Sequence, residues 1–257
     1  VKGDEANGFL VDADALRPHV TERTKALILN SPNNPSGSVC SRALLEGVAA
    51  LAVEKQFYVI SDEIYEKLIY DGEAHVSIAS LGDEIRAQTI VVNGVSKSYA
   101  MTGWRIGYAA GPKPVIRAMT AFQSHSTSNP NSIAQHAAAV ALTNGEKFMH
   151  DSLVEFDARR RLMHQLISEI PGLSAALPKG AFYMMLNISA LIGKSLNGRA
   201  IRGSDDFAEM LLESRKVAVV PARAFGDDRY VRLSYATSRD KITLGLARIA
   251  EFVKELE

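Results

Sequence analysis

Gln88-Thr-Ile-Val-Val-Asn93 is a continuous apolar run that leads directly into Gly94-Val-Ser-Lys-Ser-Tyr99. A run of β-branched residues bounded by polar ones predicts a strand that is buried on both faces. Lys25-Ala-Leu-Ile-Leu-Asn30 and Phe57-Tyr-Val-Ile-Ser61 have the same pattern, and Arg105-Ile-Gly-Tyr-Ala-Ala110 is a fourth candidate strand. These four stretches together predict a sheet at the centre of the fold.

A helix is expected between the first two strands, from Arg42 to Gln56, because apolar residues recur there at helical spacing and Ser41 is a suitable N-cap. Apolar strands with helices between them indicate a parallel sheet covered on both faces, which is an α/β fold. Successive strands end on polar residues, namely Asn30 and Asn34, then Asp62 and Tyr65, then Ser96 and Lys97. Because open α/β sheets bind ligands at the carboxyl ends of their strands, these residues predict a site there.

The pattern changes beyond Pro112, and the second half of the chain reads as a smaller α+β unit. The expected helices are 115–123, 133–142, 146–170, 205–215 and 238–257, and the expected strands are 182–188, 217–220 and 230–235, with 193–203 as a surface excursion. We therefore expect residues 1–145 to form part of a large domain, 146–170 a linking helix, and 171–257 a small C-terminal domain.

Composition excludes several classes of function. The 257 residues carry 29 Lys plus Arg against 29 Asp plus Glu, and this zero net charge argues against a nucleic-acid partner. The apolar stretches are too short to cross a membrane. The single Cys40 cannot form an internal disulfide, so a cytoplasmic location is expected. The six His show no paired spacing with Cys or acidic residues, so no metal site is expected.

Lys97 and Arg105 are the first candidates for chemistry. A lysine that follows a buried strand and loses its charge there is the type that forms a Schiff base with an aldehyde cofactor. Arg105, eight residues later, offers a planar fork suited to a phosphate. The alternative for each residue is an ordinary surface position, with the lysine in a strand–helix loop and the arginine on a solvated face.

Ser61-Asp62-Glu63-Ile64-Tyr65 places a carboxylate at the end of another predicted strand. A carboxylate beside a pyridine nitrogen would keep that nitrogen protonated, and a nearby phenol could hydrogen-bond an oxygen on the ring. The alternative is that Asp62 caps the following helix and Tyr65 packs in the core. Asn30-Ser-Pro-Asn-Asn-Pro-Ser-Gly37, taken alone, is consistent with a rigid turn and nothing more.

Together these motifs resemble the class I/II aminotransferases, the fold-type-I pyridoxal-phosphate enzymes. Asn30–Gly37, Ser61–Tyr65 and Ser96–Tyr108 occur in the family order, followed by Gly180-Ala-Phe-Tyr183 and Val231-Arg-Leu-Ser234. The resemblance implies a three-layer, parallel-rich sheet in the large domain and a small α+β C-terminal domain. Asn93–Arg105 and Gln123–Pro130 are most similar to bacterial aspartate aminotransferases of the Ib subgroup, some of which also act on prephenate.

The resemblance also implies residue roles. Lys97 would be the Schiff-base lysine and general base, and Asp62 would pair with the pyridinium nitrogen. Tyr65 and Asn34 would hydrogen-bond the 3-oxygen of pyridoxal 5′-phosphate. Arg105, assisted by Ser96, would hold the cofactor phosphate. Arg232 would bind the substrate α-carboxylate as a bidentate fork, with Asn34 nearby.

The implied activity is transfer of an amino group between an amino acid, aspartate first, and a 2-oxo acid such as 2-oxoglutarate, with ping-pong kinetics and a homodimeric parent. The alternatives are an aromatic or prephenate aminotransferase, or a lyase on the same scaffold. A non-catalytic, cofactor-binding regulatory module is a further alternative from a different class.

Two features depart from the family pattern. Gly94 stands three positions before the lysine, where many relatives have a serine that contacts the phosphate. The Gly-rich phosphate loop and the ring-stacking aromatic residue that relatives carry near the N-terminus find no counterpart here. We therefore expect the chain to be an N-terminally truncated fragment of the parent enzyme that is inactive alone.

Overall fold

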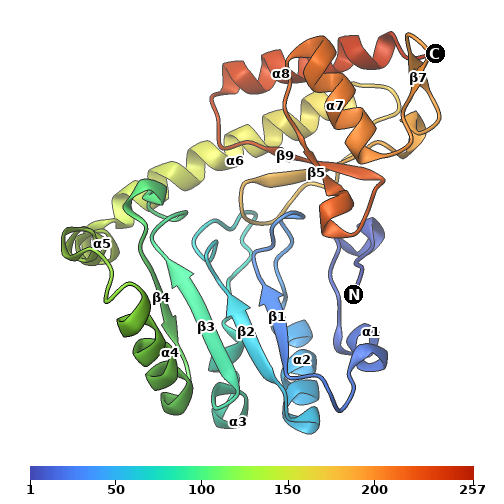
Figure 1. Ribbon diagram of the computed structural model, residues 1–257. Coiled ribbons are helices and arrows are strands. Elements are labelled where there is room, and N and C mark those ends of the chain that lie inside the picture. Colours follow the sequence, from blue (N-terminus) through green and yellow to red (C-terminus); the bar gives the residue numbers. More distant parts are fainter.

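The computed structural model describes all of residues 1–257 and contains two main sheets with a long helix between them (Figure 1). The strands are β1 Ala26–Asn30, β2 Tyr58–Asp62, β3 Thr89–Gly94, β4 Gly107–Ala110, β5 Tyr183–Asn187, β6 Ser195–Leu196, β7 Arg199–Ala200, β8 Val220–Pro221 and β9 Tyr230–Ser234. The helices are α1 Ala13–Leu16, α2 Arg42–Lys55, α3 Asp83–Arg86, α4 Lys113–Ser126, α5 Ser132–Asn144, α6 Glu146–Ser168, α7 Ser204–Arg215 and α8 Arg239–Lys254. None of these helices combines the length and the apolar character that a membrane crossing requires.

The first sheet has the order β1-β2-β3-β4, and its first three strands are parallel as predicted. The fourth strand is antiparallel to β3, so the sheet is parallel-rich, as expected, but not parallel throughout. The physical reason is the connection: a parallel neighbour needs a helical crossover, whereas only a short 3₁₀ turn, Thr102–Trp104, separates β3 from β4. The result is a mixed sheet in an α/β fold.

Helix α2 covers one face of this sheet. Ser41 caps the helix as predicted, since its side chain accepts a hydrogen bond from the backbone N–H of Leu44. Leu45 and Val48 of the helix are fully buried in a cluster that includes Val59 of β2. Burial of such side chains supplies about 2 kcal/mol each in a core of this kind.

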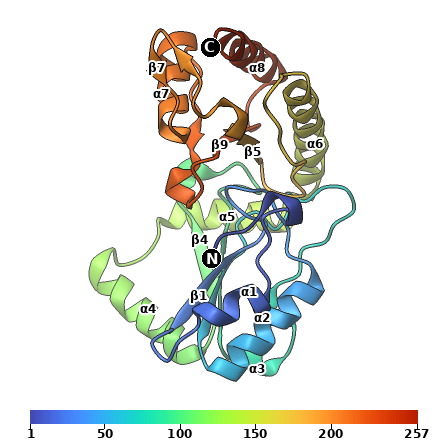
Figure 2. The same ribbon diagram turned by 90° about the vertical axis from the view of Figure 1, so that its right-hand side faces the viewer.

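The opposite face of the sheet is less covered. Ile28 is 73% exposed, and Tyr58 and Val92 are also exposed. Figure 2 shows α4 on the other side of the strands from α2 and α3, but α4 buries none of its residues. The prediction that both faces are covered therefore holds fully on one face only, because α4 does not pack closely on the strands.

The second sheet has the order β5-β9-β8, with antiparallel pairs, and packs against α6, α7 and α8. Its core is the largest in the molecule and includes Met184, Phe207 and Phe252. Residues 193–203 form the short hairpin β6–β7 and return Ile201 to this core, so the stretch is only partly the surface excursion that was predicted.

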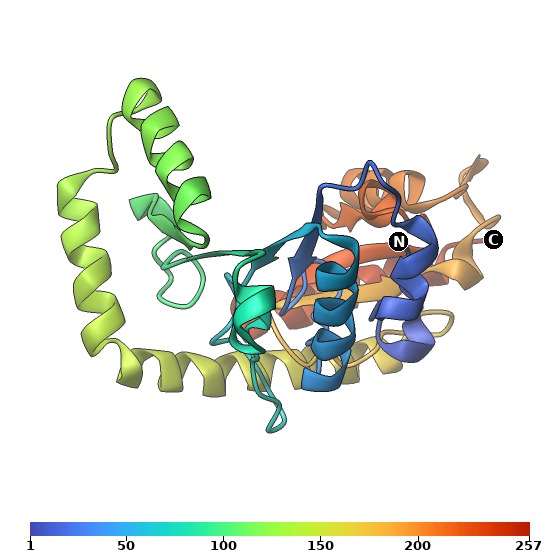
Figure 3. The same ribbon diagram turned by 90° about the horizontal axis from the view of Figure 1, so that it is seen from below.

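Helix α6 joins the regions of the two sheets and carries a fully buried arginine. Figure 3 shows the helix running from beside α5 to the second sheet. The Arg160 guanidinium donates two hydrogen bonds to the Asp71 carboxylate, at 2.9 and 2.8 Å, and one to the Pro178 carbonyl at 2.6 Å. It also pairs with Asp157 and lies 4.6 Å from the centre of the Tyr70 ring. One side chain therefore ties the loop after β2, α6 and the segment before β5 together.

Replacing this arginine is expected to destabilise the fold. Arg160→Met would leave Asp71 and Asp157 without their main partner, and breaking such a buried pair costs about 3 kcal/mol. Urea unfolding of the purified chain measures the loss. Arg161→Met, on the exposed side of the same helix turn, is the matched control and should leave the unfolding midpoint nearly unchanged. Equal effects of the two substitutions would contradict the role given to Arg160.

A buried carboxylate also fixes the end of β2. Glu63 is 4% exposed, and its carboxylate accepts hydrogen bonds from the hydroxyls of Ser61 at 2.9 Å and Ser77 at 2.6 Å. His75 Nε2 lies 2.9 Å from the same carboxylate. One carboxylate oxygen each from Glu63 and Glu66 and one ring nitrogen of His75 all lie within 4.8 Å of one another. The spacing of His75 in the sequence does not reveal this acidic neighbour, because the loop after β2 folds back onto the strand.

This network makes stability depend on pH. Burial acts to raise the pKa of the Glu63 carboxyl, but hydrogen bonds from His75 and Ser77 outweigh it, so the pKa lies below the ordinary value of 4.5. A lowered pKa in the folded state means that the ionised form stabilises the fold above pH 4.5, and that this contribution is lost as the pH falls through the lower value.

Glu63→Gln should therefore cost about 2 kcal/mol of unfolding free energy at pH 7, because a neutral amide replaces a carboxylate that accepts several hydrogen bonds. The difference from wild type should shrink as urea unfolding is repeated at pH values falling below 4.5. Glu46→Gln on the exposed side of α2 is the control and should show little difference at any pH. A Glu63→Gln difference that stays constant with pH would contradict this account.

Candidate functional site

The carboxyl ends of β1 and β2 are joined by side-chain amides. The Asn30 side chain donates to the backbone carbonyl of Asp62 at 3.0 Å and accepts from the backbone N–H of Asn34 at 2.7 Å. The predicted turn after β1 is therefore fastened to the end of β2. One side chain, that of Asn30, thus bonds to the backbone of both Asp62 and Asn34 at this edge of the sheet.

Arg232 from the second sheet reaches this edge of the first sheet. Its Nη1 donates a hydrogen bond of 2.7 Å to Oδ1 of Asn34, although the two residues are 198 positions apart. The guanidinium carbon lies 4.4 Å from the centre of the Tyr183 ring and 5.6 Å from that of Phe225. Its Nε is buried and has no hydrogen-bond partner. Arg232 therefore keeps a donor available for a ligand.

Tyr65 lies in the interior between the two sheets. Its hydroxyl is 3.0 Å from that of Tyr183, and its ring meets Phe182 edge-to-face at 5.5 Å. Burial raises the pKa of Tyr65, and the negative charge of Asp62 raises it further. The phenol is therefore neutral across the physiological range and can act as a hydrogen-bond donor.

Lys97 follows the end of β3 in a turn. Its Nζ lies 5.9 Å from the centre of the Phe182 ring, so a chain of contacts runs from Asn34 through the aromatic residues to the lysine. Ser96, Lys97 and Phe182 line a hollow of about 340 Å³, which also receives the buried and unpartnered hydroxyl of Ser98. Lys97 is half-buried beside apolar surface, as the sequence predicted.

Asp62 has a local partner as well as a place in the site. Its Oδ1 accepts a hydrogen bond of 3.2 Å from the backbone N–H of Ile64. The alternative expected a helix after Asp62, but residues 64–67 form a turn, and one carboxylate oxygen caps that turn. The side chain is only partly buried and forms no ion pair with the protein, so the carboxylate can still meet a cationic ligand.

Arg105 lies apart from these contacts. It is exposed, has a left-handed backbone with φ of 55°, and donates from Nη1 to the Thr102 carbonyl at 2.9 Å. No carboxylate of the protein pairs with it. The structure thus brings Asn34, Asp62, Tyr65, Lys97 and Arg232 into one network, while the contacts of Arg105 remain local.

The glycine at position 94 has a packing reason. A Cβ built on Gly94 would lie 2.9 Å from the Ile106 carbonyl oxygen and 3.0 Å from Cα of Gly107. Any side chain there would push against β4, so this chain cannot place a serine at that position without moving the strand. The departure from the usual pattern follows from the close approach of β4 to β3.

Three site residues had no role assigned from the sequence, namely Phe182, Tyr183 and Phe225. The motif Gly180-Ala-Phe-Tyr183 was visible, but nothing in it reveals that its rings meet Arg232, Tyr65 and Lys97. Only the segment that leads from α6 into β5 brings the rings of Phe182 and Tyr183 to the first sheet.

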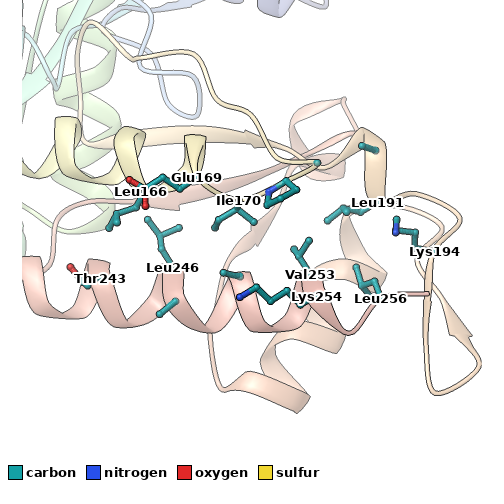
Figure 4. Close-up of a pocket in the computed structure, with 15 residues that line it drawn as sticks. Leu166, Glu169, Ile170, Leu191, Lys194, Thr243, Leu246, Val253, Lys254 and Leu256 are labelled. Atoms are coloured by element: carbon teal, nitrogen blue, oxygen red, sulfur yellow. The ribbon is translucent and has the colours of Figure 1, made fainter.

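A larger hollow, of about 710 Å³, lies elsewhere, between the end of α6 and α8 (Figure 4). Its lining is mainly apolar, with Leu166, Ile170 and Leu246 on its walls and Lys194 and Lys254 at its rim. None of the predicted site residues lines it. This hollow and the strand ends are therefore separate places in the fold.

Comparisons with known proteins agree with this geometry. Residues 1–249 match the family model "Aminotransferase class I and II". The chain is 43% identical over 255 residues to the aspartate aminotransferase of Bacillus subtilis, covering 99% of this chain and 64% of that protein. It is 41% identical over 242 residues to a probable aspartate/prephenate aminotransferase of Rickettsia bellii, covering 93% of this chain and 60% of that protein.

Its fold matches the crystal structure of the aspartate aminotransferase from Rhizobium meliloti with a TM-score of 0.95 and 40% identity. That match covers 99% of this chain and 64% of the other. The chain thus spans about 64% of the length of the first relatives that it matches. The network at the strand ends and these matches lead to one conclusion: the chain belongs to the class I and II aminotransferases.

Proposed function

We propose that this chain carries two essential residues of a pyridoxal-phosphate-dependent aminotransferase: the catalytic lysine, Lys97, and the arginine that binds the substrate carboxylate, Arg232, called here the carboxylate anchor. The enzyme would transfer the amino group of aspartate to a 2-oxo acid such as 2-oxoglutarate. The chain belongs to a family that depends on pyridoxal phosphate, which supports the choice of cofactor. A relative that is 43% identical is named aspartate aminotransferase, which supports aspartate as the substrate.

One observation carries the proposal. Lys97, Arg105 and Arg232 form no ion pair with the protein, while Asp62 at the same strand ends is likewise free of cationic partners. These three basic side chains and one carboxylate fit pyridoxal phosphate and a carboxylate substrate. The two ligands together present two anionic groups, an aldehyde and a pyridine nitrogen. When bound, the cofactor supplies an electron sink for charge that develops at the substrate Cα.

Lys97, Asp62 and Tyr65 would act on the reacting part of the bound molecules. The Lys97 Nζ would attach the cofactor aldehyde and, once free, would take the proton from the substrate Cα and deliver it to the cofactor carbon that had carried the aldehyde. The Asp62 carboxylate would hold a proton on the pyridine nitrogen. Because burial keeps Tyr65 neutral, its hydroxyl would donate to the 3-oxygen, alongside the Asn34 amide.

Arg232 would hold the substrate α-carboxylate with two adjacent N–H groups of its guanidinium, whose Nε has no partner in the protein and whose Nη1 donates to Asn34. Its planar fork suits a carboxylate better than an ammonium group does. Arg105, with Ser96 beside Lys97, would hold the cofactor phosphate. Closure of the second sheet over the first would then exclude water from the site.

We also infer how the chain is divided and assembled. Residues 1–145 would form the cofactor-binding part, 146–170 the linking helix and 171–257 the small domain that brings Arg232. Exposed apolar side chains on α4 and α5, such as Phe122 and Ile133, support a homodimer. The lone buried Cys40 supports a cytoplasmic location.

A second candidate substrate is prephenate. The relative from Rickettsia bellii is named as a probable aspartate/prephenate aminotransferase at 41% identity. Both substrates present an amino- or oxo-acid carboxylate to the same guanidinium. Arg232 would therefore serve either reaction.

The lysine assignment predicts where the cofactor attaches. After incubation with pyridoxal 5′-phosphate and reduction with borohydride, mass spectrometry should find the added mass on the peptide that contains Lys97. Lys97→Ala should lose the label, because Lys97 lines the hollow beside Phe182, whereas Lys113→Ala at the start of α4 should keep it. Equal labelling of wild type and Lys97→Ala would rule out the assignment.

The carboxylate anchor predicts a second result. Arg232→Lys should weaken binding of maleate to the cofactor-free chain about tenfold or more, because a point charge cannot form the bidentate pair. Isothermal titration calorimetry measures the dissociation constant. Arg223→Lys, in an exposed pair with Asp205, is the control and should bind as wild type does. Unchanged binding by Arg232→Lys would remove Arg232 from the site.

A further inference from the structure

Tyr183 makes two contacts with the site through different parts of one side chain. The face of its ring lies 4.4 Å from the Arg232 guanidinium carbon, and its hydroxyl lies 3.0 Å from that of Tyr65. The side chain is 7% exposed, so both contacts are shielded from water. One side chain thus contacts both Arg232, which would bind the substrate carboxylate, and Tyr65, which would bind the cofactor oxygen.

We propose that Tyr183 is a positioning residue that joins the carboxylate anchor to the cofactor phenol: its ring orients Arg232, and its hydroxyl donates to the oxygen of Tyr65. This inference rests on the proposed function, since it gives Tyr65 a cofactor oxygen to bind.

The direction of the hydrogen bond follows from counting donors. A phenol has one hydrogen to donate and lone pairs that accept. If Tyr65 is to donate its hydrogen to a ligand, the hydrogen shared with Tyr183 must come from Tyr183. The Arg232 cation over the Tyr183 ring draws electron density from that ring, which strengthens its hydroxyl as a donor.

The backbone before Tyr183 holds the side chain in this position. Ala181 is fully buried and has φ of 57°, a conformation that costs energy for a residue with a Cβ. Its carbonyl accepts hydrogen bonds from the hydroxyls of Tyr70 at 2.6 Å and Tyr235 at 3.2 Å, and its N–H donates to Leu68 at 2.9 Å. These bonds compensate for the strained backbone and fix where the following residues point.

The strand register completes the arrangement. Met185 pairs with Arg232 and Tyr183 pairs with Ser234, so Tyr183 and Arg232 lie on the same face of the sheet, one diagonal step apart. The aromatic ring can therefore support the guanidinium without any change in either strand. The two contacts can be removed separately, because one needs only the ring and the other needs the hydroxyl.

Two substitutions separate the roles. Tyr183→Phe keeps the ring and removes the hydroxyl, so the chain should bind maleate within twofold of wild type but bind pyridoxal 5′-phosphate about three- to tenfold more weakly. Tyr183→Leu removes both contacts and should also weaken maleate binding, about fivefold or more. Calorimetry with maleate on the cofactor-free chain and titration with pyridoxal 5′-phosphate give the two dissociation constants. Tyr58→Phe, exposed at the amino end of β2, is the control and should change neither constant.

The outcomes distinguish this inference from the function on which it rests. The proposal is supported if Tyr183→Phe weakens binding of pyridoxal 5′-phosphate but not of maleate, and if Tyr183→Leu weakens binding of maleate as well. Equal changes in both constants, or none, would overturn it even where wild type binds both ligands. Failure of the wild-type chain to bind pyridoxal 5′-phosphate would instead overturn the proposed function, and this inference with it.

Discussion

The buried guanidinium of Arg160 sets the relative position of the two sheets. It binds the carboxylate of Asp71 after β2, Asp157 on its own helix, and the carbonyl of Pro178 before β5. A buried charge of this kind is tolerated only when it is fully paired, so the three segments cannot separate without exposing an unpaired ion. The segment that follows Pro178 then crosses beside the first sheet, and its aromatic residues reach the strand ends.

The site depends on this crossing. The first sheet brings Asn34, Asp62 and Lys97 to its carboxyl edge at the ends of β1, β2 and β3 in turn, while the second sheet contributes Arg232. Between them lie the rings of Phe182 and Tyr183, which contact groups from both sides. Cations that have no partner in the protein are costly to hold near apolar surface, and they therefore mark the places where anionic ligands are expected.

Much of this arrangement could be predicted from the sequence, because strong local patterns decide it. Continuous apolar runs predicted β1, β2 and β3, and the polar residue after each run predicted the edge where the network lies. The direction of β4 could not be predicted from its composition, since it depends on the absence of a crossover helix. The roles of Tyr183 and His75 were also missed, because both depend on contacts between segments far apart in the sequence or on a loop that folds back.

The most direct test of the account is a crystal structure of the chain grown with pyridoxal 5′-phosphate and maleate. The account predicts electron density continuous from the cofactor to Nζ of Lys97, with the pyridine nitrogen at Asp62 and a maleate carboxylate on Arg232. Cofactor bound elsewhere, for example in the hollow between α6 and α8, or maleate bound away from Arg232, would contradict the claim that the two sheets form one site.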